Sequence, residues 1–578
     1  MDNMVQLQSK LFADEVEIVK PTKKMKILDG VSEVVFYLLI FILATVAFFV
    51  LRPLNDEIHR SAVSQMIMVV CLGGLVTFGA VLALQGKLDR KTTVFLIFCV
   101  GVVLKLFYMV YTPATTRQHD TFNKARTGHE AYAYILFSTG KLPTTNDYQF
   151  YHPPLNAILQ ATFMKFTAWL TSELTEVFNL GNYFPNAFQQ GFNSSKLAGV
   201  ENAEYRYFLY STNQILAFTY GVITSVYMLK ILKLFDFSGK TSIILSALIT
   251  LFPRTIQFSG QLNNDPISFL CSVLAIYFVL KWQREGKKIG YIIGSALSCG
   301  FGMMAKLATA TICLPIAGVF VYEFILTVTK KDGSMKFWKM FVQYALFVVV
   351  CAPIALWFQI YAKNEFGQTF GHVFGNLNKA LLTTHHSWFE RFVIASPSEY
   401  FSRIFCETFS EIVDGVIVEY NNYNLFNFSL RSALFAEVHY TYGEGFAILS
   451  IIFAYAFCVL LAIGLVWCLV QFIKAKKSGI KNANDEKIIE LKDFIFLFLL
   501  VQSQVIPEII FYVKMPYACT MDFRYIMPMI VGIALTAGYV MKALKVNGSS
   551  FAINLRRITA LAIVLMLVST TVFYCVAV

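Results

Sequence analysis

The sequence predicts an all-α integral membrane protein with about thirteen membrane-spanning helices and two large loops on the non-cytoplasmic side. Hydrophobic residues make up 57% of the 578 residues, which is more apolar surface than a soluble domain of this length can bury. Several apolar runs, such as 31–50 and 558–578, reach the roughly 20 residues that a helix needs to cross a bilayer. Lysine and arginine gather in the segments between such runs.

These cationic segments orient the chain, because Lys and Arg accumulate in cytoplasmic loops. They lie at 20–26, 87–91, 230–240, 281–288, 330–339, 474–492 and 542–557. The formal charge of +12 is therefore a topology signal and does not indicate a nucleic-acid partner. The first thirty residues are polar and charged, so the first apolar run is expected to be an uncleaved span, with the N-terminus in the cytoplasm and the C-terminus outside.

The expected spans follow from the apolar runs and this orientation. They are 32–51, 61–84, 92–111, 208–229, 241–258, 267–282, 289–305, 308–328, 340–361, 445–473, 493–513, 524–545 and 558–577. Lys105, inside the third span, is interpreted as a residue whose amine snorkels to the membrane surface.

The first large loop, 112–207, is expected to lie entirely outside, because the preceding span runs outward and the following one runs inward. The apolar run 155–170 should therefore lie in the membrane interface or re-enter it. Apolar and aromatic residues recur at helical spacing upstream, which predicts an amphipathic helix over 120–138 along the outer membrane surface. An ordinary loop helix is the alternative.

The second large loop, 362–444, mixes aromatic and polar residues and should be ordered. No soluble domain is expected beyond the two loops. Cys406 and Cys519 are the cysteines that fall clearly in outer loops, and they form either a disulfide or two free thiols.

Residues 117–120 read Arg-Gln-His-Asp and follow the third span. A carboxylate at the mouth of a span can act as a general base towards a substrate hydroxyl, which makes Asp120 a candidate. The alternative is that Asp120 only caps the following helix. Further along, His152 precedes two prolines that favour a helix start, and it either donates to a phosphate or is incidental to that start.

Asp265 lies in a short outer turn between two spans and is preceded by two asparagines. It positions an acceptor, holds a cation or caps the next helix. Three cations at outer helix ends, Arg254, Lys306 and Arg524, can hold phosphate oxygens, or serve as anchors at the membrane surface. No strong metal-ligand spacing, P-loop or dinucleotide fingerprint occurs in the sequence, so no cofactor is predicted firmly, although a divalent cation stays open.

The order of these motifs resembles the GT-C superfamily of membrane glycosyltransferases, over roughly 92–530. An Asp follows an outward span; then come His-Pro-Pro-Leu at 152–155, Asn-Asp-Pro at 264–266, Lys306 between short apolar runs, and Phe-Arg-Tyr-x-x-Pro at 523–528. The second of these is similar to an element of protein O-mannosyltransferases. The layout also looks like that of the bacterial lipid A aminoarabinose transferases.

The resemblance implies roles residue by residue. Asp120 matches the first-loop catalytic carboxylate and Asp265 the carboxylate of the following outer loop. Arg524 matches the late arginine of the family, and His152 a basic residue that approaches the donor phosphate in some members. Together with Lys306 and Arg254, these residues are expected to hold that phosphate. The residues expected to line the acceptor side are Arg117, His119, Asn264 and Tyr151. Asp120 is followed by Thr121 rather than by a second acid, a departure from the protein O-mannosyltransferases themselves.

The implied activity is transfer of a sugar from a polyprenyl-phosphate donor to a hydroxyl acceptor of a glycolipid, cell-wall polymer or protein, on the non-cytoplasmic face and with inversion. The chain then divides into an N-terminal part with two extra spans (1–91), a catalytic module (92–361), the second outer loop (362–444) and C-terminal helices (445–578). The plasma membrane, or the endoplasmic reticulum in a eukaryote, is the expected location. A multi-pass transporter or lipid flippase is the rival class, and convergence of Asp120, Asp265 and Arg524 on one outer cavity would favour the enzyme.

Overall fold

A computed structural model gives the architecture of residues 23–58, 62–123, 125–178, 203–235, 237, 239–330, 335–371, 382–395, 404–406, 411–413, 416–418, 422–438, 440–478 and 488–577. These residues are almost entirely helical. A pair of three-residue antiparallel strands, β1 (Glu411–Val413) and β2 (Val416–Val418), is the exception, with Ile412 opposite Ile417.

Eleven of the described helices are long and apolar enough to cross a membrane. Two shorter apolar helices, α10 (Gly239–Thr250) and α13 (Ile289–Ala305), occupy the places of two further expected spans. The all-helical membrane class is thereby confirmed. The long helices include α2 (Lys23–Ile58), α3 (Ala62–Leu84), α4 (Arg90–Tyr111), α9 (Gln214–Leu234), α12 (Asp265–Arg284), α14 (Cys313–Val328), α15 (Phe337–Phe366), α19 (Glu444–Ser478), α20 (Leu491–Lys514), α21 (Met529–Asn547) and α22 (Ser550–Val576).

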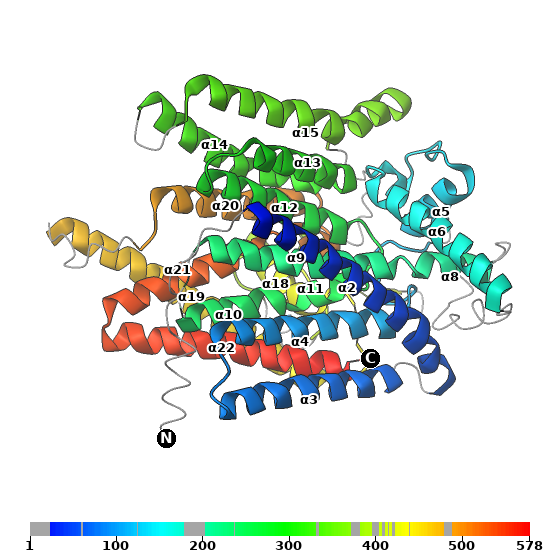
Figure 1. The fold of residues 1–578 in the computed structure, drawn as a ribbon, viewed down its shortest axis with the longest axis horizontal. Coiled ribbons are helices and arrows are strands. Elements are labelled where there is room, and N and C mark those ends of the chain that lie inside the picture. The colour runs from blue at the N-terminus through cyan, green and yellow to red at the C-terminus, as the bar shows by residue number, and fades with distance from the viewer. Residues whose placement is uncertain are drawn as a thin grey trace.

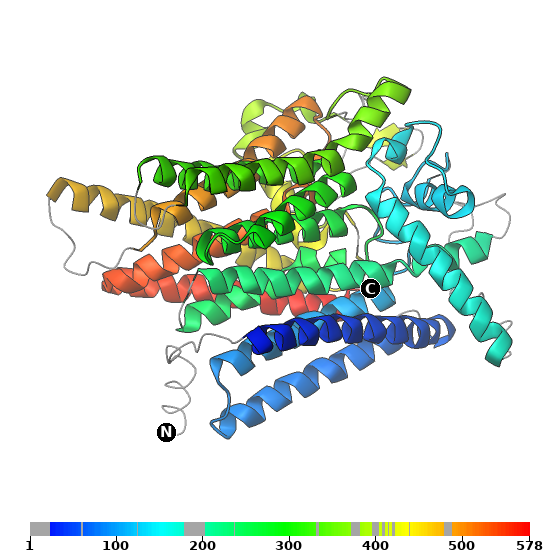
Figure 2. The ribbon, with the colours of Figure 1, turned by 45° about the horizontal axis from the view of Figure 1, so that its top comes forward.

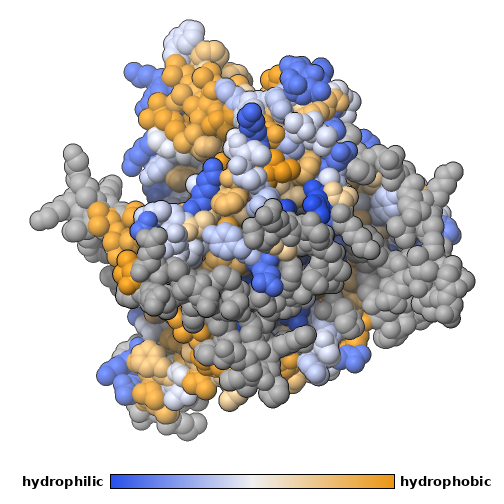
Figure 3. Space-filling model, turned by 90° about the vertical axis from the view of Figure 1, so that its right-hand side faces the viewer, coloured by the Kyte–Doolittle hydropathy of each residue, from blue (hydrophilic) through white to orange (hydrophobic). Residues whose placement is uncertain are grey.

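The long helices lie side by side with their axes in a common direction (Figures 1 and 2). The helices of the first loop, α5 (His129–Thr139), α6 (Leu155–Phe178) and α8 (Ala203–Ser211), gather at one end of this bundle (Figure 1). Figure 3 faces that end of the molecule and shows hydrophilic side chains among hydrophobic ones across it. The site described below is built at this end.

The first loop differs in part from expectation. The helix expected over 120–138 begins only at His129, because residues before it form turns in which the Asn123 side chain accepts a hydrogen bond from the Thr127 amide (2.8 Å). The helix α6 starts directly after Pro153 and Pro154, as expected, and runs obliquely across the end of the bundle (Figure 2). It is not among the helices apolar enough to span a membrane.

The span expected at 241–258 is broken in two. The helix α10 ends at Thr250, and α11 (Pro253–Phe258) begins with a proline in its first turn. The Lys105 amine donates to the Thr250 carbonyl (2.8 Å) at the end of α10 and is 1% exposed. The snorkelling interpretation of Lys105 is therefore wrong: its amine stays inside the bundle, where it donates to the open carbonyl end of a helix.

A second break separates α13 from α14. Lys306 has an extended backbone (φ −154°, ψ 125°) that ends α13, and the chain continues as the 3-10 helix η3 (Leu307–Ile312). The break brings the Lys306 side chain to the first residue of α12, with which it pairs. Irregular backbone of this kind at a helix end lets a charged side chain face a cavity rather than lipid.

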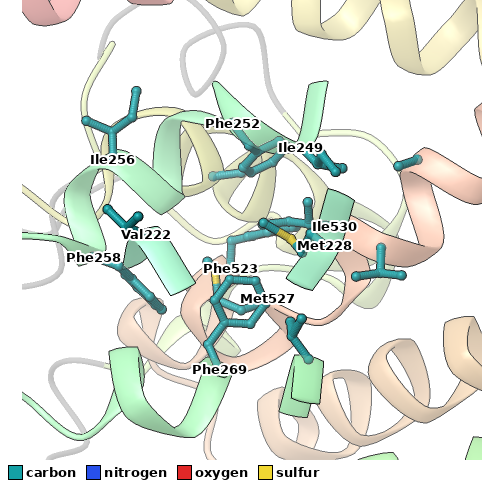
Figure 4. Packing of buried hydrophobic residues seen from close by; sticks show 14 of the residues in the cluster. Val222, Met228, Ile249, Phe252, Ile256, Phe258, Phe269, Phe523, Met527 and Ile530 are labelled. Atoms are coloured by element: carbon teal, nitrogen blue, oxygen red, sulfur yellow. The ribbon is translucent and has the colours of Figure 1, made fainter. Parts of the chain in front are cut away.

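The apolar core lies directly beneath the site. Phe252, at the start of α11, stacks on Phe523 with ring centroids 5.6 Å apart, and Phe258 meets Phe269 of α12 edge to face. Figure 4 shows these rings packed together with Val222, Met527 and Ile530. Phe523 belongs to η7 (Phe523–Ile526), so this packing fixes the backbone that carries the neighbouring Arg524.

The second loop is partly helical and contributes to the same core. The helix α18 (Leu425–Phe435) packs against α11 and η7. Shorter turns are η5 (Thr383–His385), α16 (Trp388–Phe392) and η6 (Ala518–Met521). Cys406 and Cys519 are not joined to each other, so the disulfide alternative is not formed.

Candidate active site

A cavity of about 320 Å³ lies where the first loop meets the ends of α12, α20 and η7. Seven of the ten side chains singled out in the sequence line it: Asp120, Tyr151, His152, Asn264, Asp265, Lys306 and Arg524. They come from segments up to four hundred residues apart, so no single stretch of sequence contains the site. Arg524 belongs to the C-terminal part of the chain, and the cavity therefore extends beyond the module expected at 92–361.

The loop that carries Asp120 is held in an unusual backbone conformation. Asp120 has φ 54° and Tyr148, across the loop, has φ 45°, which L-residues rarely adopt and which costs free energy unless neighbouring structure enforces it. The enforcing contacts come from the start of α5, where the His129 amide donates to the Asp120 carbonyl and the Glu130 amide to the Thr121 carbonyl (both 3.0 Å).

Gly128, the N-cap of α5, is required by this close approach. A Cβ at position 128 would lie 2.5 Å from the Thr121 carbonyl oxygen and 2.9 Å from that of Asp120. The helix itself is anchored to α8, since Arg206 donates to the Glu130 carboxylate (Nη2 to Oε2, 2.7 Å) and both side chains are buried. The local sequence thus holds the Asp120 loop rigidly at the cavity wall.

The Asp120 carboxylate has one anchored oxygen and one that faces a cation. The Tyr148 hydroxyl donates to Oδ1 (2.5 Å), while Oδ2 lies 3.9 Å from Nη2 of Arg524, beyond hydrogen-bond distance. The side chain is 31% exposed. Burial, assisted by the adjacent carboxylate, raises the pKa of Tyr148, so this phenol remains a neutral donor. The Asp120 side chain does not cap α5, and that alternative is wrong.

Asp265 is occupied differently. Its Oδ1 pairs with the Lys306 amine, and its Oδ2 accepts from the Asn263 amide (2.9 Å). The side chain makes no capping bond to α12, whose N-cap is Asn264, so the capping alternative is wrong here too. Lys306 also lies over the Tyr525 ring (4.5 Å to the centroid). Asp265 is therefore the partner that holds Lys306 at the cavity.

Arg524 presents a buried guanidinium to the cavity. Its amide donates to Oδ1 of Asp522 (3.0 Å), and its Nη2 donates to the Tyr525 hydroxyl (3.0 Å). Its Nε has no hydrogen-bond partner in the described structure and lies 3.6 Å from Oδ2 of Asp522. A buried cation with an open donor is suited to binding an anionic oxygen.

His152 and His129 lie near each other on the loop side, with ring centroids 6.0 Å apart. Burial lowers the pKa of His152 well below its usual range and that of His129 to about 4, and the cations Lys306 and Arg524 act in the same direction. Both rings are neutral near pH 7. His152 can therefore approach a phosphate as a hydrogen-bond donor, but not as a cation.

The remaining three predicted residues stand behind the cavity and do not line it. Arg254 is fully buried on α11 and donates to Oδ2 of Asp522 (2.7 Å) and to Gln257 (2.9 Å). His119 lies 3.5 Å from the Arg254 guanidinium, and Arg117 covers the Tyr440 ring (4.8 Å). Arg254 thus fixes Asp522, which in turn holds Arg524.

The described residues bring one group of three potential metal ligands together, His119, Glu437 and Asp522, with donor atoms within 4.8 Å of one another. The Arg254 guanidinium already neutralises Asp522. Burial raises the pKa of the Glu437 carboxyl well above its usual range, which favours its neutral form. These residues do not fit a divalent cation, because the positive charge is already supplied.

Several cavity residues escaped the sequence analysis. They are Gln149, Gln359, Gln368, Ser503, Gln504 and Glu508. A signal existed for Glu508, since an acid next to Pro507 inside the apolar run 493–513 is costly unless it serves a purpose. The glutamines carry no such signal, because an uncharged amide has many ordinary roles in loops and in helices.

Comparison with known protein families gives one match. Residues 213–357 match the model of the family described as dolichyl-phosphate-mannose-protein mannosyltransferase. This segment runs from the start of α9 into α15 and contains Asp265 and Lys306, but not Asp120 or Arg524. No curated protein matches the chain significantly.

Proposed function

We propose that this protein transfers a sugar from a lipid-linked donor to a hydroxyl acceptor on the non-cytoplasmic face. The premise is that the chain belongs to the dolichyl-phosphate-mannose-protein mannosyltransferase family, whose members are GT-C-type membrane glycosyltransferases with such a donor. The acceptor is a glycolipid, a cell-wall polymer or a protein. The acceptor oxygen bonds to the anomeric carbon as the bond from that carbon to the phosphate oxygen breaks. The polyprenyl phosphate leaves with the bonding electrons, and single displacement inverts the anomeric centre.

One observation carries this proposal: two carboxylates and two cations from distant segments line one cavity, namely Asp120, Asp265, Lys306 and Arg524. Transfer from a phosphate to a hydroxyl needs a base at one side of the sugar and positive charge at the other. Convergence at one end of the bundle favours an enzyme over a transporter, which places its charged groups near the membrane midplane.

Asp120 is the proposed general base. Its Oδ1 is fixed by Tyr148, and its Oδ2 accepts no hydrogen bond from the described residues and lies 3.9 Å from Nη2 of Arg524. Asp265 is a poorer candidate, because both of its oxygens already accept hydrogen bonds. The proton of the acceptor hydroxyl therefore passes to Asp120 as the new bond forms.

Lys306 and Arg524 are the proposed phosphate ligands. The negative charge on the leaving phosphate grows in the transition state, and two buried cations at fixed positions stabilise that growth without reorganising. A phosphate is a good leaving group, so no general acid is required. Asp265 and Asp522 position these cations, while Arg254 supports the second of them through Asp522.

An exposed apolar surface for the donor's lipid tail lies beside the cavity, on α20. Pro507 and Phe511 of α20 line the cavity, and Ile506, Ile510 and Val513 of the same helix are 43–48% exposed. An apolar face of this kind suits contact with hydrocarbon chains. The polyprenyl chain would lie along α20 in the lipid, with its phosphate inside the cavity.

The testing experiment supplies purified protein in lipid nanodiscs with a panel of polyprenyl-phosphate sugars. We expect at least one donor to be cleaved, with release of polyprenyl phosphate that depends on Lys306 and Arg524. Absence of cleavage and of transfer for every donor, in protein that is folded and binds the donors, would contradict the proposed function.

A further inference from the structure

Three buried side-chain oxygens line the cavity without a hydrogen-bond partner among the residues that the structure describes. They are Oε1 of Gln149, Oε1 of Gln368 and Oε1 of Glu508, and each of these residues is 5% exposed. They come from three elements: the 3-10 helix η1 (Tyr148–Tyr151), the segment after α15, and α20. Buried polar atoms are normally paired, so three open acceptors around one cavity indicate a ligand that donates hydrogen bonds.

A neighbouring contact fixes the Gln368 side chain in place. The Gln368 amide nitrogen donates to the Tyr151 carbonyl (3.2 Å), which leaves its oxygen as the open atom. Beside Glu508, the Gln504 amide nitrogen donates to Ser503 (2.9 Å) and to Thr311 (3.2 Å). Pro507 has no N–H, so the Ser503 carbonyl one turn earlier in α20 lacks its usual helical donor.

These acceptor oxygens differ in their chemistry from the cations that line the same cavity. Acceptor oxygens repel a phosphate, whereas Lys306 and Arg524 attract it. Hydroxyl groups are the natural partners of these acceptor oxygens, and a sugar joined to the phosphate carries several. The lipid tail and the phosphate offer no hydrogen-bond donor at neutral pH.

We propose that Gln149, Gln368 and Glu508 bind hydroxyl groups of the donor sugar, and that Glu508 is the main specificity-determining residue of this subsite. The inference rests on the proposed function, since it assigns the donor's sugar to these three side chains and the donor's phosphate to the cations. Glu508 outweighs the two amides, because its carboxyl group carries two oxygen atoms that can bond sugar hydroxyls, whereas each amide carries one.

The test compares binding of polyprenyl-phosphate mannose with binding of polyprenyl phosphate alone, measured by calorimetry in nanodiscs. Glu508→Leu removes both acceptor oxygens and should weaken binding of the mannosyl donor by about 10- to 100-fold, while leaving polyprenyl phosphate within about twofold. Glu508→Gln keeps one acceptor oxygen and should weaken binding of the mannosyl donor less than Glu508→Leu does. The matched control is Glu365→Gln, which removes an exposed carboxylate from α15 outside the cavity and should change neither ligand.

Mono-deoxy mannosyl donors sharpen the test. Removal of the hydroxyl that Glu508 binds should lower the affinity of wild-type protein for the donor by about the same factor as Glu508→Leu does. The same removal should lower the affinity of the Glu508→Leu variant little further. If Glu508→Leu weakens binding of the mannosyl donor and of polyprenyl phosphate equally, Glu508 acts on the phosphate. If the losses of affinity from Glu508→Leu and from each deoxy donor simply add, Glu508 contacts no hydroxyl. Either result overturns the inference. Failure of the proposed function is distinct, since wild-type protein would then cleave no donor at all.

Discussion

Replacing Arg524 by Lys keeps the positive charge but removes the planar fork, and this separates phosphate binding from simple anchoring. The Arg524 guanidinium is held by Tyr525 and Asp522, and its buried Nε, 3.6 Å from the Asp522 carboxylate, makes no hydrogen bond to the described residues. A lysine amine is a point charge that cannot make two parallel bonds to a phosphate. The loss is therefore one charge-assisted hydrogen bond.

Such a bond contributes about 1.5–3 kcal/mol, which corresponds to roughly 10- to 100-fold in affinity. We expect Arg524→Lys to weaken binding of polyprenyl phosphate by that factor, as measured by calorimetry in nanodiscs, and to slow transfer at least as much. The matched control is Arg557→Lys, an exposed arginine on α22, which should leave both quantities unchanged. Wild-type affinity and turnover in Arg524→Lys would refute the reasoning and leave Arg524 as an anchor.

Three further predictions concern the loop, the pH and the topology. Gly128→Ala places a Cβ within 2.5 Å of the Thr121 carbonyl oxygen, so it should lower the free energy of unfolding by about 1–3 kcal/mol and reduce turnover. The control variant Gly445→Ala has open space around the new Cβ and should change neither quantity. Equal melting temperatures of the two variants would contradict this prediction. The pKa of His129 is about 4 in the folded protein, against 6.5 for an ordinary histidine. Between these two pH values the unfolded chain therefore binds more protons than the folded protein. The contribution of His129 to stability is full above pH 6.5 and should fall as the pH drops towards 4. His129→Gln should flatten that dependence in thermal melts, and an unchanged slope would assign it to other groups. A single cysteine introduced at Asn146 should react with an impermeant reagent added from outside, and labelling only from the cytoplasmic side would reverse the orientation.

Much of the helical architecture could be predicted from the sequence, because the bilayer imposes length and hydrophobicity on each span. The expected spans overlap helices of the structure, and the short helices α10 and α13 lie at two of them, but the span expected at 241–258 is broken between α10 and α11. The breaks could not be placed by that criterion. Apolar periodicity does not reveal that α10 stops at Thr250 or that Lys105 reaches its carbonyl, because both depend on packing between helices distant in sequence.

The site could be predicted where a charged residue stands out against an apolar background. Asp120, Asp265, Lys306 and Arg524 carried that signal and line one cavity, although their catalytic roles stay predictions. Arg254 carried the same signal but lies behind the cavity, since the sequence does not distinguish a ligand contact from a buried support for Asp522.

Other site residues have no local signature at all. Tyr148 holds the Asp120 carboxylate from 28 residues away, and only the positive φ angles of both residues bring the two together. Gln149 and Gln368 are ordinary amides in sequence and become informative only when their buried oxygens are found without partners. The first helix was placed too early for a related reason: the turns at 120–128 depend on side-chain bonds such as that of Asn123 to Thr127.

The most direct test of the central claim is the rate of sugar transfer by Asp120→Asn protein. Asparagine preserves the shape of the side chain and can still accept from Tyr148, but it cannot take a proton from the acceptor hydroxyl. If Asp120 is the general base, the variant should fold, bind the polyprenyl-phosphate donor nearly normally and lose roughly 10²–10⁴-fold in turnover. Asp265→Asn should instead weaken donor binding, because Lys306 loses its charged partner. Wild-type turnover in folded Asp120→Asn protein would contradict the assignment of the base and with it the proposed mechanism.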